Sequence, residues 1–251
     1  MEWTVQKKSN IRRLPKVLWP AAVLARNIRE LAAPPKPFAA DGMTTFHSTA
    51  FRDTPRFSVA YSRAVQAGGW DYGIPFRVHQ ALWCAKLAER VEGDFVELGT
   101  GRGFVVSALL KDGIKRPVHL FDTFNVNWVG SDGSQTEEDA SPYYATSLEA
   151  VRANFAEWPN AILHPGDVYK TLPASGIRQV AFLHVDMNHP DPEEFGVRYF
   201  WPLMPSNAVL LFDDYAFKDC ERQRERIDLL AEELGFDVLT TASGQGIAIK
   251  P

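Results

Sequence analysis

Short apolar runs alternate with longer stretches of helical periodicity along most of the chain. The short runs predict strands, and they lie at 94–98, 117–121, 161–164, 180–185 and 208–212. Apolar residues at helical spacing predict helices over 74–91, 104–110, 143–158, 192–204 and 217–234. Two further strands, 236–241 and 246–250, follow in hairpin order. The pattern predicts an α/β fold: a Rossmann-like, seven-stranded, mostly parallel sheet with helices on both faces and an antiparallel C-terminal edge.

The length of 251 residues suits one α/β domain with an elaboration. We expect residues 1–73 to form a helical N-terminal extension or cap, and residues 74–251 to form the main domain. Residues 1–40 hold eight Lys and Arg against two Glu, an excess of six positive charges. This basic segment fits peripheral contact with an anionic membrane or a partner, but also a cap helix with a solvated basic face. The sequence leaves both interpretations open.

The helix predicted at 74–91 carries an apolar face that includes Ile74, Val78 and Leu82. We expect Arg77 and Lys86 on its solvent side. Further along, residues 124–142 are polar, acidic and glycine-bearing. A stretch of this length without predicted structure inside a compact domain is usually functional, so we interpret it as a lid.

Composition limits the partners and the cellular compartment that we expect for this protein. A net charge of −4 gives no reason to expect a nucleic-acid partner. Cys84 and Cys220 lack the spacing of a metal or redox motif, which predicts free thiols in a reducing compartment. No apolar run approaches the roughly 18 residues of a membrane span. Charges and prolines interrupt the N-terminus, so no signal peptide is predicted. We expect a cytoplasmic protein.

A glycine-rich turn links the strand at 94–98 to the helix that follows it. Bare backbone N–H groups at such a turn can bind a ligand. A dinucleotide fingerprint would need glycine at position 104, where Phe104 stands. The pattern E-x-G-x-G-x-G resembles motif I of the class I S-adenosylmethionine (SAM) methyltransferases. The candidate cofactor residues in this segment are Glu97, Gly99, Thr100, Gly101 and Gly103.

Acidic residues at the ends of the next two strands are further candidates for the cofactor site. Asp122, followed by Thr123, ends the second strand, where a carboxylate can accept from the two hydroxyls of an adenosine ribose. Asp167 follows the strand at 161–164, where it could accept from an adenine amino group. A plain turn acid is the alternative at Asp122.

Three more carboxylates are expected at the same edge of the sheet. Asp186 ends the strand at 180–185, and Asp213 and Asp214 end the strand at 208–212. Crowded anions are costly, and a hard divalent cation such as Mg²⁺ removes that cost. The alternative is that one acid of the pair caps the next helix while the other points to water.

From about residue 75 to the C-terminus the chain resembles the macrocin/mycinamicin-type sugar O-methyltransferases, a metal-dependent SAM family. The resemblance implies a Rossmann-like fold, Mg²⁺ bound by Asp186, Asp213 and Asp214, and methylation of a sugar hydroxyl. The segments that carry it are GDFVELGTGRG, LFDTF, SLEAVRANF, HVDMN and LLFDDY.

Two departures from the family pattern affect the chemistry. The family usually has D-G-D where this chain has Asp186-Met187-Asn188, and Asn188 cannot accept a proton at neutral pH. His189 stands next to it and can act as a base. The usual glycine pair before the fifth strand is Ser206-Asn207, so the acceptor can differ from a macrolide sugar.

The sequence therefore predicts an O-methyltransferase that uses SAM and Mg²⁺ or a similar cation. The methyl group would pass in line to a hydroxyl of a sugar or glycosylated small molecule. Asp186 and His189 are the candidate catalytic residues, with a metal-bound water as the alternative base to His189. We expect a homo-oligomer, a dimer. Two other functions stay open: an NAD(P)-type oxidoreductase, and a SAM-binding module without catalytic activity.

Overall fold

The computed structural model describes residues 15–18, 20–25, 37–124 and 147–251. The predicted lid lies outside the described residues apart from Phe124, as does most of the basic N-terminal segment. Within the described part, a short 3-10 helix, η1, spans Lys16–Leu18. No helix there has the length and apolar character that crossing a membrane would require.

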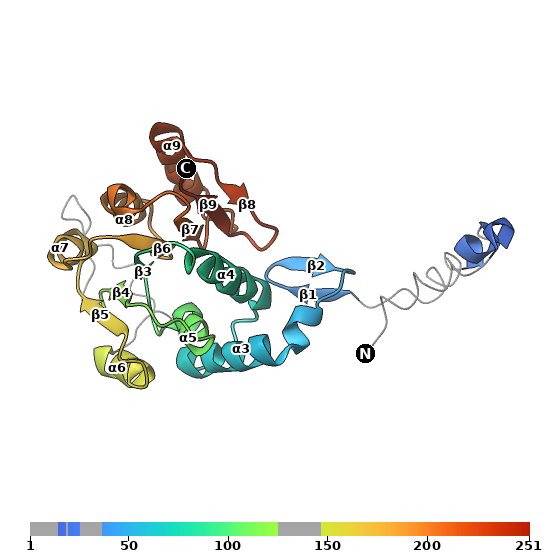
Figure 1. Ribbon diagram of the computed structural model, residues 1–251, viewed down its shortest axis with the longest axis horizontal. Coiled ribbons are helices and arrows are strands. Elements are labelled where there is room, and N and C mark those ends of the chain that lie inside the picture. The colour runs from blue at the N-terminus through green and yellow to red at the C-terminus, as the bar shows by residue number, and fades with distance from the viewer. Residues whose placement is uncertain (1–14, 19, 26–36, 125–146) are drawn as a thin grey trace.

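A seven-stranded sheet forms the centre of the molecule, in the order β5-β4-β3-β6-β7-β9-β8 (Figure 1). The strands from β5 to β7 pair in parallel, whereas β9 is antiparallel to both β7 and β8. This arrangement confirms the predicted fold class. The strands are β3 (Asp94–Leu98), β4 (Val118–Asp122), β5 (Ala161–Pro165), β6 (Val180–Val185), β7 (Val209–Phe212), β8 (Leu239–Thr240) and β9 (Gly246–Ile249).

Helices cover both faces of the sheet and bury two apolar clusters. Alternate strand residues point to opposite faces, so Phe95 and Phe182 pack on one side while Val96 and Leu183 pack on the other. The first face is covered by α4 (Pro75–Ala88), α5 (Phe104–Lys111) and α6 (Leu148–Phe155). The second face is covered by α7 (Val168–Ala174), α8 (Pro190–Phe200) and α9 (Glu221–Leu234), with the 3-10 helix η4 (Trp201–Leu203) after α8.

Three helices begin more than one residue away from their predicted starts. Helix α6 begins at Leu148 rather than at residue 143, and the Ser147 side chain caps it. Helix α8 begins at Pro190 rather than Pro192, because the His189 side chain caps it and Pro190 is suited to its first turn. Helix α9 begins at Glu221 rather than Phe217, since a turn follows β7 and Asp219 within it has a φ of 69°. The free thiols predicted at Cys84 and Cys220 are confirmed.

The described part of the N-terminal extension packs against the sheet domain. It contains a hairpin of β1 (Phe38–Ala40) and β2 (Met43–Thr45), the 3-10 helix η2 (Ala50–Asp53) and the helix α3 (Pro55–Gly68). Helix α3 lies alongside α5 (Figure 1). Arg63 of α3 pairs with Glu157 at 3.0 Å beyond α6. The extension therefore shares the core of the first sheet face.

Helix α3 packs tightly against aromatic rings at Gly68. A Cβ added there would lie 2.6 Å from Cδ2 of Phe104 and 2.8 Å from Cε2 of Tyr72. We expect Gly68→Val to force these rings apart and lower the free energy of unfolding by about 1–3 kcal/mol. Chemical denaturation measures this. Gln66→Val, an exposed position on the same helix, is the control and should cost much less. Equal losses would show that helix propensity, not the contact, is responsible.

Candidate active site

The carboxyl ends of the parallel strands bring the predicted site residues to one edge of the sheet. The backbone pairing continues past the strands, because the N–H of Asp186 donates to the Leu98 carbonyl at 2.8 Å. Likewise the N–H of Asp213 donates to the Val185 carbonyl at 2.9 Å. The residues that follow β3, β6 and β7 are therefore fixed side by side.

The glycine loop after β3 touches the carboxylate-bearing turn after β6. A Cβ at Gly99 would lie 1.8 Å from the backbone oxygen of Asp186, so only glycine fits there. Gly103 is closed in similarly, because a Cβ would lie 2.3 Å from Cζ of Phe155. Gly101 differs: its added Cβ would have nothing within 4 Å. The loop thus packs tightly at its ends and is open in its middle.

Asp122 at the end of β4 holds this loop. Its Oδ2 accepts from the Gly101 N–H at 2.7 Å, and its Oδ1 accepts from the Phe124 N–H at 2.9 Å. Thr100, also in the loop, is buried. Thr123 lies between Asp122 and Phe124, which the second hydrogen bond joins. Asp167 lies at the end of β5 but caps α7, where it accepts from the Tyr169 N–H at 3.0 Å.

Glu97 and His184 form a buried pair between neighbouring strands. They are register partners in β3 and β6, and Nδ1 of His184 lies 3.0 Å from Oε1 of Glu97. Burial raises the pKa of Glu97. Burial opposes the charged form of His184, but the carboxylates of Asp213 and Glu97 raise the pKa of His184 to about 10. Oε2 of Glu97 is buried without a hydrogen-bond partner among the described residues.

The structure gathers the three predicted metal ligands. Oxygen atoms of Asp186, Asp213 and Asp214 lie within 4.8 Å of one another. Burial and the charges of Asp213 and Asp214 raise the pKa of Asp186, and burial and Asp213 raise the pKa of Asp214. Burial also opposes ionisation of Asp213, but Arg77 and His184 lower the pKa of Asp213 below its usual range.

The prediction that Arg77 lies on the solvent face of its helix is wrong. Its residue surface is only 6% exposed, and its Nη1 donates to Oδ2 of Asp213 at 2.6 Å and to Oδ1 of Asp214 at 3.0 Å. Arg77 lies on the same stripe of α4 as the buried Ala81, Ala85 and Ala88. This stripe of small residues at helical spacing was the available signal. The charge of arginine outweighed it in the sequence interpretation.

The turn between β8 and β9 supplies two further contacts that the sequence analysis missed. Nε2 of Gln245 donates to Oδ1 of Asp213 at 2.6 Å, and the backbone oxygen of Ser243 accepts from Nε of Arg77 at 3.2 Å. Gln245 is fully buried. The antiparallel edge of the sheet therefore completes the surroundings of Asp213.

A tight turn follows Asp186 and is held by a glutamate from α8. Asn188 has a φ of 57°, and Oε1 of Glu193 accepts from the Met187 N–H at 3.2 Å. Burial raises the pKa of Glu193 to about 8, against the lowering effect of the neighbouring backbone N–H groups. Nδ1 of His189 accepts from the Asp191 N–H at 3.4 Å and so caps α8. The sequence analysis did not identify Glu193.

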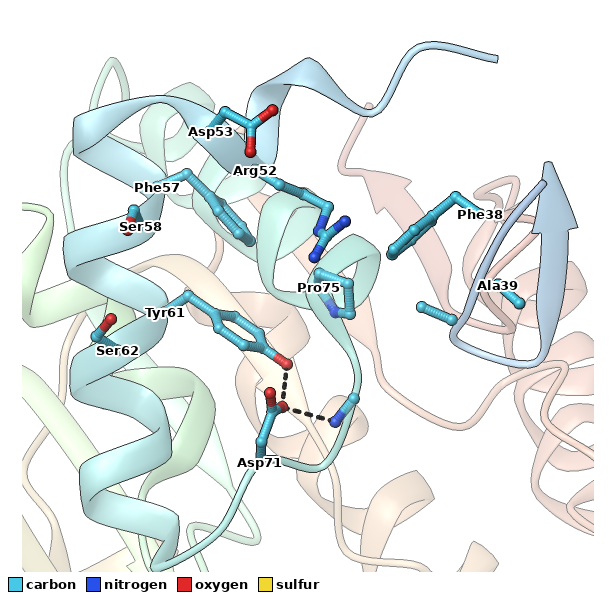
Figure 2. Close-up of a pocket in the computed structure, with 12 residues that line it drawn as sticks. Phe38, Ala39, Arg52, Asp53, Phe57, Ser58, Tyr61, Ser62, Asp71 and Pro75 are labelled. Carbon is cyan, nitrogen blue, oxygen red and sulfur yellow. Dashed lines mark hydrogen bonds between the residues drawn. The ribbon is translucent and has the colours of Figure 1, made fainter. Parts of the chain in front are cut away.

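A pocket of about 350 Å³ opens beside the first turn of α4 (Figure 2). Aromatic rings from β1 and α3 form part of its wall, and Arg52 lies over the ring of Phe38 at 4.1 Å. Tyr61 donates to Oδ1 of Asp71 at 2.5 Å, and the same oxygen accepts from the Gly73 N–H at 2.8 Å. Pro75 lines the pocket, and two residues later Arg77 reaches the carboxylates.

The fold is shared with solved O-methyltransferases. Among solved structures, the chain is similar to the O-methyltransferase NovP, with 20% identity over 81% of this chain and 99% of NovP and a TM-score of 0.62. It is also similar to CalS11, calicheamicin methyltransferase, with 13% identity, 82% and 98% coverage and a TM-score of 0.54. An apo structure described as CalS11, TDP-rhamnose 3'-O-methyltransferase, gives 14% identity, 78% and 95% coverage and a TM-score of 0.51.

The sequence profile of the macrocin O-methyltransferase family (TylF) matches residues 77–229, more than half of the chain. The chain therefore belongs to this family and is a SAM-dependent O-methyltransferase. No curated protein matches the sequence. Family membership confirms the resemblance drawn from the motifs. It also sets aside the two alternatives, a nicotinamide-dependent oxidoreductase and a binding module without activity.

The raised pKa of Glu193 predicts a pH-dependent contribution to stability. Its pKa of about 8 in the fold exceeds its ordinary value of 4.5, so the folded state holds the proton more tightly. Stability from this group is present below pH 4.5 and falls until about pH 8, by up to about 1.4 kcal/mol per pH unit. In Glu193→Gln the neutral amide oxygen keeps the acceptor for Met187.

Denaturant titrations of metal-free protein between pH 5 and pH 8 measure this contribution as the difference between wild type and Glu193→Gln. We expect the variant to lose less stability as the pH rises. Parallel curves would assign the pH dependence to other groups of the site.

Proposed function

We propose that this enzyme transfers the methyl group of SAM to a hydroxyl of a sugar or glycosylated small molecule, with a divalent cation at Asp186, Asp213 and Asp214. One observation carries the proposal. The glycine loop and the carboxylate cluster are in direct contact, because Gly99 packs against the backbone of Asp186. A cofactor on the loop and an acceptor at the cluster would therefore be neighbours, as in-line transfer requires.

The loop and the residues around it provide the groups that SAM needs. Gly101 faces open space and can let the ligand approach the backbone. The buried Oε2 of Glu97 can accept from the ammonium group of SAM, since its other oxygen is already bonded to His184. We assign the ribose hydroxyls to Asp122 and the adenine side to Asp167. Gly99, Thr100, Gly103 and Thr123 complete the assigned cofactor site.

The three carboxylates fit a hard divalent cation. Their oxygens are the ligands that Mg²⁺ prefers, and their separation of at most 4.8 Å lets one ion reach all three. When bound, such an ion polarises an acceptor hydroxyl and makes it more acidic. The protein contributes the rest: β6 and β7 fix the ligands, and the Glu193 contact holds the turn after Asp186.

His189 is the proposed proton acceptor, and its role as the cap of α8 determines which ring nitrogen can take the proton. Since Nδ1 accepts from the Asp191 N–H, the proton of the neutral ring is placed on Nε2. The proton of the substrate hydroxyl would thus bind to Nδ1, and the hydrogen bond from the Asp191 N–H that caps α8 would be broken. Asn188, which replaces the usual family aspartate, cannot take this role.

A sugar acceptor is supported by two findings. The family profile is that of the macrocin O-methyltransferases, and a protein of the same fold is described as a TDP-rhamnose 3'-O-methyltransferase. The pocket beside α4 combines aromatic rings with Arg52, Asp53 and Asp71, which suits a polar ring compound (Figure 2). We assign this pocket to the part of the acceptor that is remote from the reacting hydroxyl.

The loop assignment predicts the effect of Gly101→Val. The side chain would enter the open space above the loop, so SAM affinity should fall at least about 100-fold. Isothermal titration calorimetry measures this. Gly113→Val is the matched control, because Gly113 also has a positive φ and nothing within 4 Å of its added Cβ, at the far end of α5. Wild-type affinity in Gly101→Val would place the cofactor elsewhere.

Asp122→Ala tests the ribose assignment separately. The loss of charge-assisted hydrogen bonds should weaken SAM by about 1.5–3 kcal/mol. The same titration measures it. Asp167→Ala gives the comparison for the adenine side, with a smaller expected loss because Asp167 already caps α7. An unchanged dissociation constant in Asp122→Ala would leave Asp122 with the loop contact alone.

Removal of divalent cations should abolish methyl transfer and leave SAM binding intact, because the cofactor residues are not the metal ligands. S-adenosylhomocysteine release with TDP-rhamnose and macrolide glycosides as acceptors measures transfer. Asp214→Ala should behave like chelated wild type.

His189→Ala should lose about 10²–10⁴ in rate with cation binding retained. Full activity in EDTA would exclude the metal role, and full activity of His189→Ala would move the base elsewhere.

A further inference from the structure

The carboxylate cluster already contains a positive charge of the protein's own. Nη1 of Arg77 bonds to both Asp213 and Asp214, and the Arg77 side chain is almost fully buried. These are two of the three residues assigned to the cation. A cation bound there would therefore share two ligands with a guanidinium group.

Arg77 is fixed in this position from several sides. Its backbone N–H donates to Oδ1 of Asp41 at 3.1 Å, and its Nε donates to the Ser243 carbonyl at 3.2 Å. Its guanidinium carbon lies 4.6 Å from the centre of the Phe217 ring. Nη2 is buried without a hydrogen-bond partner among the described residues. The side chain is built into the site and is not a surface group that has folded inwards.

The arginine and a divalent cation compete for the same oxygens. Asp213 already accepts from Arg77 at Oδ2 and from Gln245 at Oδ1, and Asp214 accepts from Arg77 at Oδ1. A cation within coordination distance of these carboxylates lies close to the guanidinium, and like charges repel strongly where water is largely excluded. Binding of a divalent cation thus either breaks some of the hydrogen bonds of Arg77 or is weakened by repulsion from the Arg77 charge.

We propose that Arg77 is a resident counter-cation, which holds Asp213 and Asp214 together when no divalent cation is bound and lowers the affinity of the cluster for one. The inference rests on the cation site proposed above. It makes Arg77 a positioning residue that sets the cation concentration at which the enzyme becomes active. The role follows from the charge of Arg77, so a neutral replacement must change cation affinity and metal-free stability in opposite directions.

The test compares wild type, Arg77→Met and Arg77→Lys as full-length proteins. Mn²⁺ binding is measured by electron paramagnetic resonance, and thermal unfolding is measured in EDTA and in excess Mn²⁺. Arg77→Met should bind Mn²⁺ about tenfold tighter or more, since the competing charge is gone. Its melting temperature should fall by several degrees in EDTA and recover in Mn²⁺. Arg77→Lys keeps a charge and should stay within a few-fold of wild-type affinity.

Arg198→Met is the control for the loss of an arginine. Arg198 of α8 has a side chain that is 41% exposed, and it pairs with Glu194 of the same helix and Glu233 of α9 rather than with the cluster. Its Mn²⁺ affinity should equal that of wild type. Should Arg77→Met not fold in EDTA, expression and purification with Mn²⁺ should yield folded protein, and failure of that rescue would overturn the proposal.

The outcomes separate the inference from the function on which it rests. Equal or weaker Mn²⁺ binding by Arg77→Met, with wild type binding the ion, would overturn the counter-cation role and leave the cation site in place. Absence of Mn²⁺ binding in both proteins would overturn the cation site and this inference together. Binding by Arg77→Met alone would support the inference in its strongest form, with the arginine excluding the ion.

Discussion

Charge compensation at the buried edge of the sheet is the constraint on which this structure depends. Asp213 is 5% exposed, and its carboxylate contacts groups from three separate parts of the chain. Arg77 comes from α4 and Gln245 from the β8–β9 turn, while His184 of β6 places Nε2 3.7 Å away. A buried carboxylate without such partners would be strongly destabilising. The residues that surround Asp213 therefore tie together the start, the middle and the end of the domain.

The same arrangement joins cofactor chemistry to acceptor chemistry. His184 contacts Glu97 on one side and approaches Asp213 on the other, so one imidazole links the strand that opens the glycine loop with the strand that carries the cluster. Both partners raise the pKa of His184 against the effect of burial, and this favours the charged form of the ring. The positive charge between two carboxylates lets both acids lie in a dry interior. His184 thus both packs between the neighbouring strands and compensates the charge of the two carboxylates.

The sequence was sufficient for the sheet and for the residues that the parallel strands bring together. Apolar runs located β3 and β6 correctly, and the rule that parallel strands share an edge brought Asp186 to Asp213. It was insufficient where a residue's role depends on a contact distant in sequence. Arg77 lies 136 residues from Asp213, and although the stripe of small residues on its helix points to burial, no local pattern identifies the carboxylates that it contacts. Likewise, no local pattern predicts that Gln245 contacts Asp213.

Two segments outside the family match bracket the carboxylate cluster. The match covers 77–229, whereas Asp41 binds the first turn of α4 from the N-terminal side and Gln245 binds Asp213 from the C-terminal side. A chain trimmed to the matched core would keep every assigned metal ligand and lose groups that hold Arg77 and Asp213 in place. Divergence in these flanking segments can therefore alter the electrostatic setting of the reaction while the recognisable motifs stay unchanged.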